Sequence, residues 1–97
     1  MPTYELSVRF KRDFERLTVG DQAAFRVAVE RFVADLGSGR GFRQGLRVKG
    51  VQGAPNVFEM TWAPDGRATF EFGPQHTEGA PHVIWRRVGT HAVLKRP

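Results

Sequence analysis

His91 and Arg67 combine a side-chain type and a position that suit proton transfer and phosphate binding. His91 follows a strand-like segment that Gly89 interrupts, and imidazole titrates near neutral pH, so it could act as a general acid or base. Arg67 follows a turn glycine, and its planar guanidinium could hold a phosphate group. Each has a structural alternative: His91 as a solvated histidine in a terminal loop, and Arg67 as the partner of a carboxylate across a sheet.

Other charged side chains lie on or near the same strands. Glu59 or Glu71 could act as a base, although a surface ion pair is the interpretation that we favour for both. The remaining basic candidates could contact phosphate groups or form solvated surface; they are Arg47, Lys49, Arg86 and Arg87. Because side chains alternate along a strand, we expect Arg86 and Arg87 to point to opposite faces, so that at most one serves a common site.

The chain offers little metal or thiol chemistry. It contains no cysteine, which excludes disulfide bonds, thiolate metal sites and a cysteine nucleophile. His76 and His82 flank a loop, but their spacing is not that of a metal-binding motif. We therefore expect no metal ion and no other cofactor.

Length and composition fit one small folded unit. With 97 residues, of which 40% are hydrophobic, the chain can form one core, and we expect a single domain over residues 1–97. No stretch reaches the roughly 18 apolar residues that a membrane span needs, and the start of the chain does not resemble a signal peptide. These features predict a soluble protein of the cytoplasm that has no membrane partner.

Positive charge is concentrated in the later part of the chain. Basic and acidic side chains are equal in number up to Asp35, so the formal net charge of +5 belongs to the residues that follow. No acidic residue lies between Leu36 and Phe58 or after Glu78. Such a region attracts phosphate polyanions or an acidic protein segment, although a basic surface can also serve solubility alone.

The first part of the chain predicts one strand and two helices. Apolar and polar residues alternate over 3–10, which is typical of a half-buried strand. A short helix is expected over 11–17, and apolar residues three and four apart predict a longer one over 21–36. Thr18 resembles the start of a capping box for the longer helix, and Gly37 is expected to end it in a left-handed conformation.

The later part predicts a meander of three strands. They span 57–62, 67–72 and 82–88, after a short extended piece in 46–50. Turn residues over 63–66 make the first two of these strands a hairpin. Its apolar residues share one face only if Thr61 lies opposite Arg67 and Glu59 opposite Thr69.

The two apolar surfaces of these elements must meet. Neither the stripe of the longer helix nor one face of the sheet can be left in water, so the helices must cover the sheet. We therefore expect an α+β fold of two layers, in which the N-terminal strand is free to join the same sheet as the meander.

Taken in order, several segments resemble the RelE/ParE superfamily of bacterial type II toxins. They are YELSVRFKRDFERL, LRVKGVQG, VFEMTW, GRATFEF and HVIWRRVGTHAVL. The more specific features are Leu-Arg-x-Lys ahead of a Phe-Glu strand, an arginine that opens the next strand, and an Arg-x-Gly-Thr-His ending. The resemblance implies a microbial ribonuclease-like fold and an antitoxin as protein partner. It also implies either cleavage of mRNA in the ribosomal A site or, in the ParE branch, inhibition of DNA gyrase.

The resemblance also implies roles for individual residues. His91 matches the basic residue or histidine that follows the last strand in cleaving members, and Arg67 matches an arginine at the start of a strand. Some cleaving members carry lysines where this chain has Glu59 and Thr61.

The hypothesis that we favour is a RelE-like mRNA interferase, a toxin that inhibits translation as an endoribonuclease on ribosome-bound mRNA and needs no metal ion. Its catalytic candidates are His91, Arg67 and Glu59, and its RNA-binding candidates are Arg47, Lys49 and Arg87. The alternatives are a ParE-like gyrase inhibitor, an inactive binding module of the same fold, and a plain nucleic-acid binder.

Overall fold

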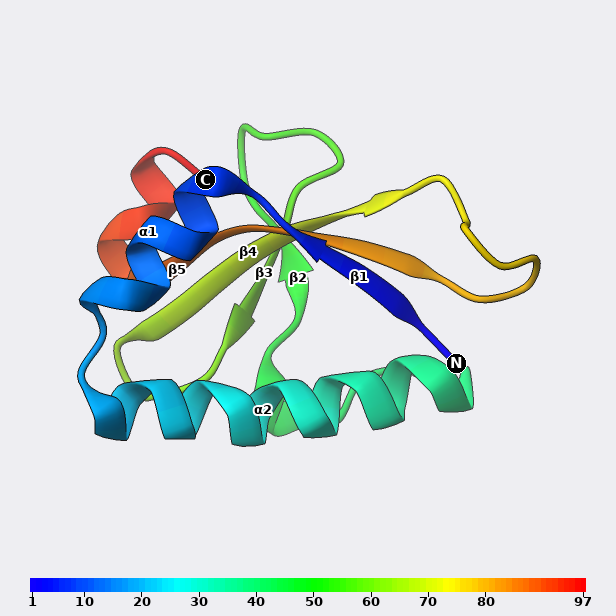
Figure 1. The fold of residues 1–97 in the computed structure, drawn as a ribbon, viewed down its shortest axis with the longest axis horizontal. Coiled ribbons are helices and arrows are strands. Elements are labelled where there is room, and N and C mark those ends of the chain that lie inside the picture. Colours follow the sequence, from blue (N-terminus) through cyan, green and yellow to red (C-terminus); the bar gives the residue numbers. More distant parts are fainter.

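The computed structural model describes all residues, 1–97, and shows a five-stranded sheet with a long helix along one face (Figure 1). The elements are β1 (Thr3–Leu6), α1 (Val8–Arg16), α2 (Val19–Ser38), the 3-10 helix η1 (Gln44–Leu46), β2 (Lys49–Gly50), β3 (Phe58–Thr61), β4 (Gly66–Gly73), β5 (His82–Thr90) and the 3-10 helix η2 (His91–Lys95). The strand order is β1-β5-β4-β3-β2, with β1 parallel to β5 and the other pairs antiparallel. The predicted α+β fold, a meander joined by the N-terminal strand, is confirmed.

The hairpin of β3 and β4 has the register that the sequence predicted. Thr61 pairs with Arg67, and Glu59 pairs with Thr69. Met60 and the other core residues of these strands therefore share the face that α2 covers. A slip by one residue would turn Glu59 into the core, because successive side chains of a strand point to opposite faces.

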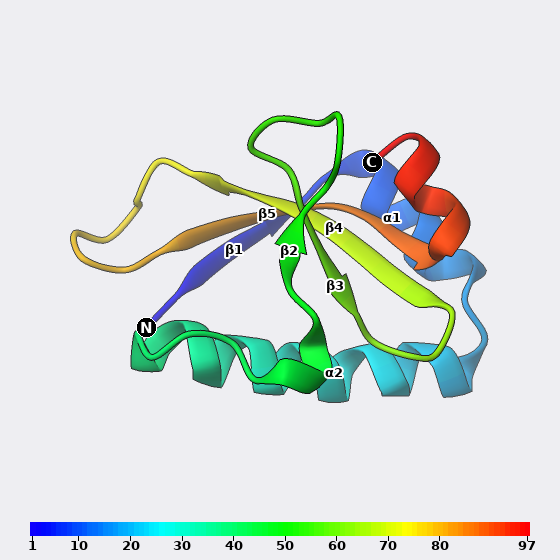
Figure 2. The ribbon, with the colours of Figure 1, turned by 180° about the vertical axis from the view of Figure 1, so that it is seen from behind.

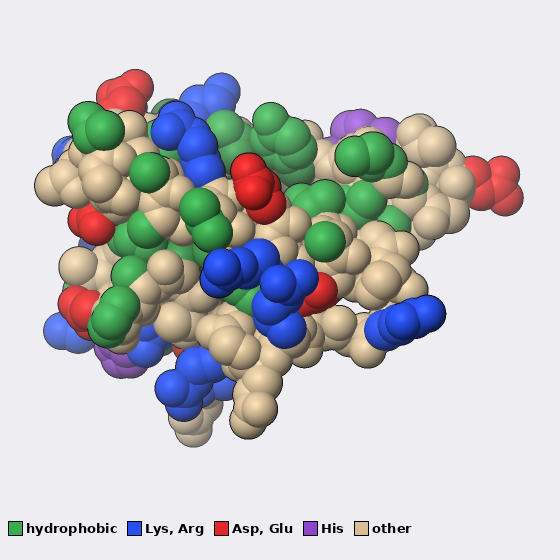
Figure 3. Space-filling view, turned by 90° about the horizontal axis from the view of Figure 1, so that it is seen from below, with side chains coloured by type: hydrophobic (Ala, Val, Ile, Leu, Met, Phe, Trp, Pro, Cys, Tyr) green, Lys and Arg blue, Asp and Glu red, His purple; other side chains and the backbone are tan.

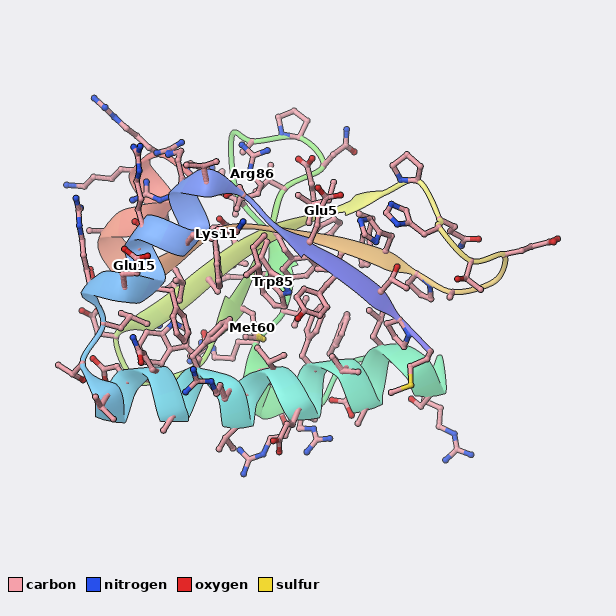
Figure 4. The ribbon with its side chains drawn as sticks, in the orientation of Figure 1. Glu5, Lys11, Glu15, Met60, Trp85 and Arg86 are labelled. Carbon is pink, nitrogen blue, oxygen red and sulfur yellow. The ribbon has the colours of Figure 1, made fainter.

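Aromatic side chains hold α2 on the sheet. The ring of Phe32, which is 1% exposed, lies 4.9 Å from the ring of Phe70 and 5.1 Å from that of Trp85, measured between centroids. Phe25 packs edge-on against Trp85 at 5.7 Å. Burying such a side chain contributes about 1.5–3 kcal/mol, and each aromatic contact about 0.5–1.5 kcal/mol more. Met60 and Trp85 complete this core between the sheet and α2 (Figure 4).

The predicted strand over 3–10 is wrong in its second half. β1 ends at Leu6, and Ser7 is the N-cap of α1, with its Oγ accepting a hydrogen bond from the Phe10 N–H at 3.0 Å. Alternation was misleading because Phe10 reaches the core from a helix and not from a strand. The helix-starting preference of Ser7 outweighs the strand pattern here.

Helix α2 begins at Val19 and ends at Ser38, so it is longer than the predicted 21–36. Thr18 caps its start as expected, with its Oγ1 accepting a hydrogen bond from a first-turn N–H at 3.0 Å. The left-handed residue at the other end is Gly39, with φ 69°, and not the predicted Gly37. Neither α1 nor α2 combines the length and hydrophobicity that crossing a bilayer requires.

The last strand also runs further than predicted. β5 continues through Gly89 to Thr90 before η2 begins. A Cβ on Gly89 would come within 2.9 Å of the Val93 Cγ1, so the glycine allows η2 to pack closely against the strand. Gly89 thus serves packing and does not break the strand.

The turn between β3 and β4 depends on Gly66. A Cβ there would come within 2.5 Å of the Trp62 Cε2 and 2.9 Å of the Ala63 Cβ. Gly66→Ala should therefore lower the free energy of unfolding by about 1–3 kcal/mol, the usual cost of overpacking. Gly50→Ala is the matched control, because a Cβ on Gly50 meets no atom within 4 Å. Urea unfolding measures both variants, and equal stabilities would contradict this packing.

Candidate functional site

The polar face of the sheet is covered by the C-terminal segment. The Pro97 main-chain oxygen accepts hydrogen bonds from Thr69 Oγ1 at 3.0 Å and from Arg86 Nε at 3.1 Å. Helix η2, which precedes this segment, contacts β4 and β5 and lies beside α1 (Figure 2). Thr69 is fully buried beneath it. The centre of this face is therefore closed to a large ligand.

A β-bulge brings Arg86 and Arg87 to this same segment. The register between β4 and β5 shifts after Thr69, which leaves Arg86 without a partner in the ladder. Arg86 Nε then donates to the Pro97 oxygen, and Arg87 Nη1 donates to the Arg96 carbonyl at 3.1 Å. The prediction that Arg86 and Arg87 point to opposite faces is wrong, because side-chain alternation is interrupted at a bulge.

Arg87 is fixed by Asp13 of α1 in a two-point ion pair. Its Nε lies 2.6 Å from Oδ2 and its Nη2 lies 3.1 Å from Oδ1. The Val88 N–H donates to the same carboxylate at 3.2 Å. The hydrogen bond to Asp13 raises the pKa of Arg87, and the pair ties α1 to β5. Arg87 therefore has little freedom to reach a phosphate group.

The two carboxylates of the sheet face have different surroundings. Glu71 forms an ion pair with Arg86, with Oε2 2.7 Å from Nη1. Arg86 lies on the side of the sheet away from α2 (Figure 4). Glu59 lies between Lys49 and Thr69 in the sheet register, is 6% exposed and forms no ion pair. This burial limits the contact that Glu59 can make with a substrate.

Arg67 and His91 lie at the same end of the sheet. Arg67 pairs with Gly89 in the ladder, and Gly66 pairs with Thr90, the residue before His91. The guanidinium of Arg67 turns back onto the β3–β4 turn, where Nη1 donates to the Gly66 carbonyl at 2.9 Å. It forms no ion pair with either sheet carboxylate. His91 is exposed at the start of η2.

A basic cleft of about 540 Å³ opens beside Arg67, between α2, η1 and the β3–β4 turn. Four arginines line it and no acidic residue does; they are Arg31, Arg43, Arg47 and Arg67. They converge because the chain after α2 runs back along the helix before it enters β2 (Figure 2). The indole N–H of Trp62, another lining residue, is buried without a hydrogen-bond partner. This arrangement suits an anion such as a phosphate group.

The arginines of the cleft differ in whether they form an ion pair with a carboxylate. Arg43 is paired with Asp35 through Nε and Nη2, both at 2.8 Å. Arg31, Arg47 and Arg67 form no ion pair. These three are therefore the cations that the cleft offers to a ligand.

Arg31 is the unpaired arginine of the cleft that sequence reasoning missed. It belongs to the part of the chain up to Asp35, in which basic and acidic side chains are equal in number. Arg47 and Arg67, in contrast, were predicted from the sequence as an RNA-binding and a catalytic residue. Arg31 precedes the buried Phe32 and follows the buried Ala28 by three positions, so it borders the face of α2 that packs on the sheet. The helical period of α2 could have indicated Arg31. A charged residue at the border of the apolar stripe lies next to the elements that pack on this stripe.

The charge division along the sequence is not a division in space. Asp35 and Asp13, from the balanced part of the chain, neutralise Arg43 and Arg87 from the basic part. On the outer side of α2, acidic and basic side chains are interspersed (Figure 3). Folding therefore distributes the unpaired positive charge over both parts of the chain.

The fold is that of known RelE/ParE-like toxins. No family model and no curated protein matches the chain. Similar solved structures include the E. coli DinJ-YafQ toxin–antitoxin complex (TM-score 0.63, 16% identity, 96% of each chain) and the RelB-RelE antitoxin–toxin complex from Methanococcus jannaschii (0.61, 14%, 94% of each chain). The YoeB/ParE toxin from Agrobacterium tumefaciens is similar at TM-score 0.66 and 8% identity, over 92% of this chain and 98% of that one. The expected family fold is therefore confirmed over nearly the whole chain.

The Asp35–Arg43 pair at the edge of the cleft predicts a pH-dependent stability. The Arg43 side chain, and then its backbone N–H, donate hydrogen bonds that lower the pKa of Asp35 to about 2. Since folding lowers this pKa, the stabilisation is present above the unfolded value near 4 and is lost as the pH falls through about 2. Asp35→Asn should therefore melt below wild type at pH 6, and the difference should shrink toward pH 2.

Glu78→Gln is the control for this series, because Glu78 is exposed and forms no ion pair. Its melting temperature should stay close to that of wild type at pH 6. A melting-temperature difference for Asp35→Asn that stays constant from pH 6 to pH 2 would contradict the lowered pKa.

Proposed function

We propose that this protein is the toxin of a type II toxin–antitoxin pair and that it cleaves ribosome-bound mRNA. The fold supports a toxin, because chains of the same fold occur in toxin–antitoxin complexes. The observation that carries the cleavage proposal is the group of unpaired arginines that ends at Arg67, with His91 at the same end of the sheet. Arginines beside an imidazole can bind a phosphate group and move a proton next to it.

The chemistry that we propose is attack of an RNA 2′-hydroxyl on the adjacent phosphorus. His91 takes up the 2′-hydroxyl proton, and Arg67 stabilises the added negative charge on the phosphate oxygens. The bond from phosphorus to the 5′-oxygen breaks, and that oxygen takes a proton from water. The hydroxide that this leaves takes the proton from His91, which restores the neutral imidazole. The products are a 2′,3′-cyclic phosphate and a 5′-hydroxyl end, and no step requires a metal ion. His91 suits the proton transfer better than Glu59, because His91 is exposed and Glu59 is buried.

Gyrase inhibition is the second candidate function. Glu59 and Thr61 occupy the positions of β3 where some cleaving members carry lysines, and Glu59 is buried. A sheet face without these cations favours a protein that binds its target and does not cut RNA.

An exposed apolar groove supports a protein partner, which we propose is the antitoxin. The groove, of about 680 Å³, lies between β1, α1 and α2, and Tyr4 and Leu6 of the edge strand β1 contribute to it while partly exposed. Lys11 and Glu15 of α1 line its margin (Figure 4). An apolar surface of this kind, with a charged margin, is typical of a protein interaction site.

The cleft predicts how RNA binding depends on salt. If Arg31 and Arg47 each contact one phosphate of single-stranded RNA, removing either should reduce the slope of log K against log salt by about 0.7. Filter binding of a short RNA by Arg31→Ala and Arg47→Ala at several salt concentrations measures the slopes. Arg16→Ala removes an exposed arginine of α1 that has no ion pair and lies outside the cleft, and it should keep the wild-type slope. Unchanged slopes in both cleft variants would contradict phosphate binding there.

The cleavage proposal predicts that a reporter mRNA is cut in a translation extract. His91→Ala should cleave at least about 100-fold more slowly, the low end of what a general acid or base contributes. Arg67→Ala should also lose most activity, because it removes the charge beside the phosphate. Arg40→Ala, an exposed arginine outside the cleft, is the control and should cleave as wild type does.

A gyrase supercoiling assay separates the two candidate functions. If folded wild type inhibits supercoiling and does not cleave the reporter, the function is gyrase inhibition and not mRNA cleavage. Cleavage without effect on supercoiling is the result that we expect.

A further inference from the structure

Two histidines and a glutamate meet at the end of the sheet that is away from the basic cleft. The loop between β4 and β5 extends beyond the sheet at the end opposite the β3–β4 turn (Figure 1). His76 belongs to this loop, and its ring stacks on that of His82 at 3.8 Å between centroids. Glu5 reaches the same place from β1, because β1 pairs in parallel with β5 and Thr3 lies opposite His82.

The three side chains bring their ligand atoms close together. His82 Nε2 lies 2.8 Å from Glu5 Oε1. Each of the three residues, Glu5, His76 and His82, offers one ligand atom, and these three atoms lie within 4.8 Å of one another. Two imidazoles and a carboxylate form a ligand set that suits Zn²⁺ and similar divalent transition metals.

The buried histidine of this group is held as metal ligands usually are. His82 is 1% exposed, and its Nδ1 lies 2.7 Å from Thr3 Oγ1. A ligating histidine typically uses its second ring nitrogen for such a hydrogen bond, which fixes the orientation of the ring. With Nδ1 engaged by Thr3, Nε2 is the remaining ring nitrogen, and it faces Glu5. A metal ion would take the place of the proton between Nε2 and the Glu5 carboxylate.

We propose that Glu5, His76 and His82 bind one divalent transition-metal ion. Zinc bonds of about 2.0–2.1 Å separate tetrahedral ligand atoms by about 3.3 Å, so the His82–Glu5 contact widens only slightly from 2.8 Å. Glu5 and His76 are exposed and can make this adjustment, while His82 stays fixed. The bound ion joins β1, β5 and the loop before β5, and a fourth coordination position is left for water.

This site departs from the expectation that His76 and His82 do not form a metal site. Their spacing in sequence gives no signal, because Glu5 comes beside His82 only through the parallel pairing of β1 with β5. The cluster shares no residue with the basic cleft or with His91. It therefore does not depend on the proposed function.

The test is a calorimetric titration of ZnCl₂ into the full chain, purified without a histidine tag and freed of metal with a chelator. Wild type should bind one zinc ion per chain. His76→Ala and Glu5→Gln remove exposed ligands and leave the buried His82 intact, and each should weaken binding by at least about tenfold. His91→Ala is the matched control, because it removes the exposed histidine that lies outside the cluster, and it should bind zinc as wild type does.

Thermal melting gives a second readout. Zinc should raise the melting temperature of wild type and of His91→Ala, because the ion binds the folded chain, and should raise that of His76→Ala much less. Absence of stoichiometric binding by wild type would overturn the proposal. So would wild-type affinity in both His76→Ala and Glu5→Gln, or loss of binding in His91→Ala.

Discussion

The packing of Phe32 against Phe70 and Trp85 is the interaction on which the rest of the structure depends. It fixes α2 across the sheet, and the rotation of the helix about its axis follows from it. Because Phe32 points into the core, the preceding Arg31 is held at the margin of the helix, where the returning chain brings Arg47. The positions of Arg31 and Arg47 in the basic cleft therefore follow from aromatic packing, and of the four cleft arginines only Arg43 is held by a carboxylate, that of Asp35.

On the polar face of the sheet, in contrast to the cleft, Arg86 and Arg87 are both paired with carboxylates. Because of the bulge in β5, the side chains of Arg86 and Arg87 both form hydrogen bonds with the C-terminal segment. Arg86 also pairs with Glu71, and Arg87 with Asp13. These arginines serve the fold, since they fasten η2 and α1 to the strands. Of the residues proposed for RNA cleavage, Arg67 and His91 form no ion pair and lie at one end of the sheet, and the cleft opens beside Arg67. Folding thus pairs Arg86 and Arg87, and likewise Arg43, with carboxylates, so these three arginines are less available to a substrate than the sequence suggested.

Much of the fold could be predicted from the sequence, and its limits have physical reasons. The stripe of α2 and the register of β3 with β4 follow from hydrophobic periods that only one arrangement satisfies. The end of β1 at Leu6 could not be read from alternation, because the Ser7 cap changes the conformation without changing the pattern. For the candidate site, Arg67 could be predicted from the sequence because it follows the turn glycine Gly66 at the start of a strand. The approach of Arg31 to Arg67 arises from tertiary packing between segments whose spacing in sequence is uninformative.

Cleavage of mRNA during translation is the central claim, and mapping RNA ends tests it most directly. Two reporter mRNAs, identical except that one lacks its start codon, are incubated with the protein in a translation extract, and their 5′ ends are sequenced. We predict new 5′-hydroxyl ends inside the coding region of the translated reporter and none in the reporter without a start codon. Equal cleavage of both reporters, or new ends in neither, would contradict the claim.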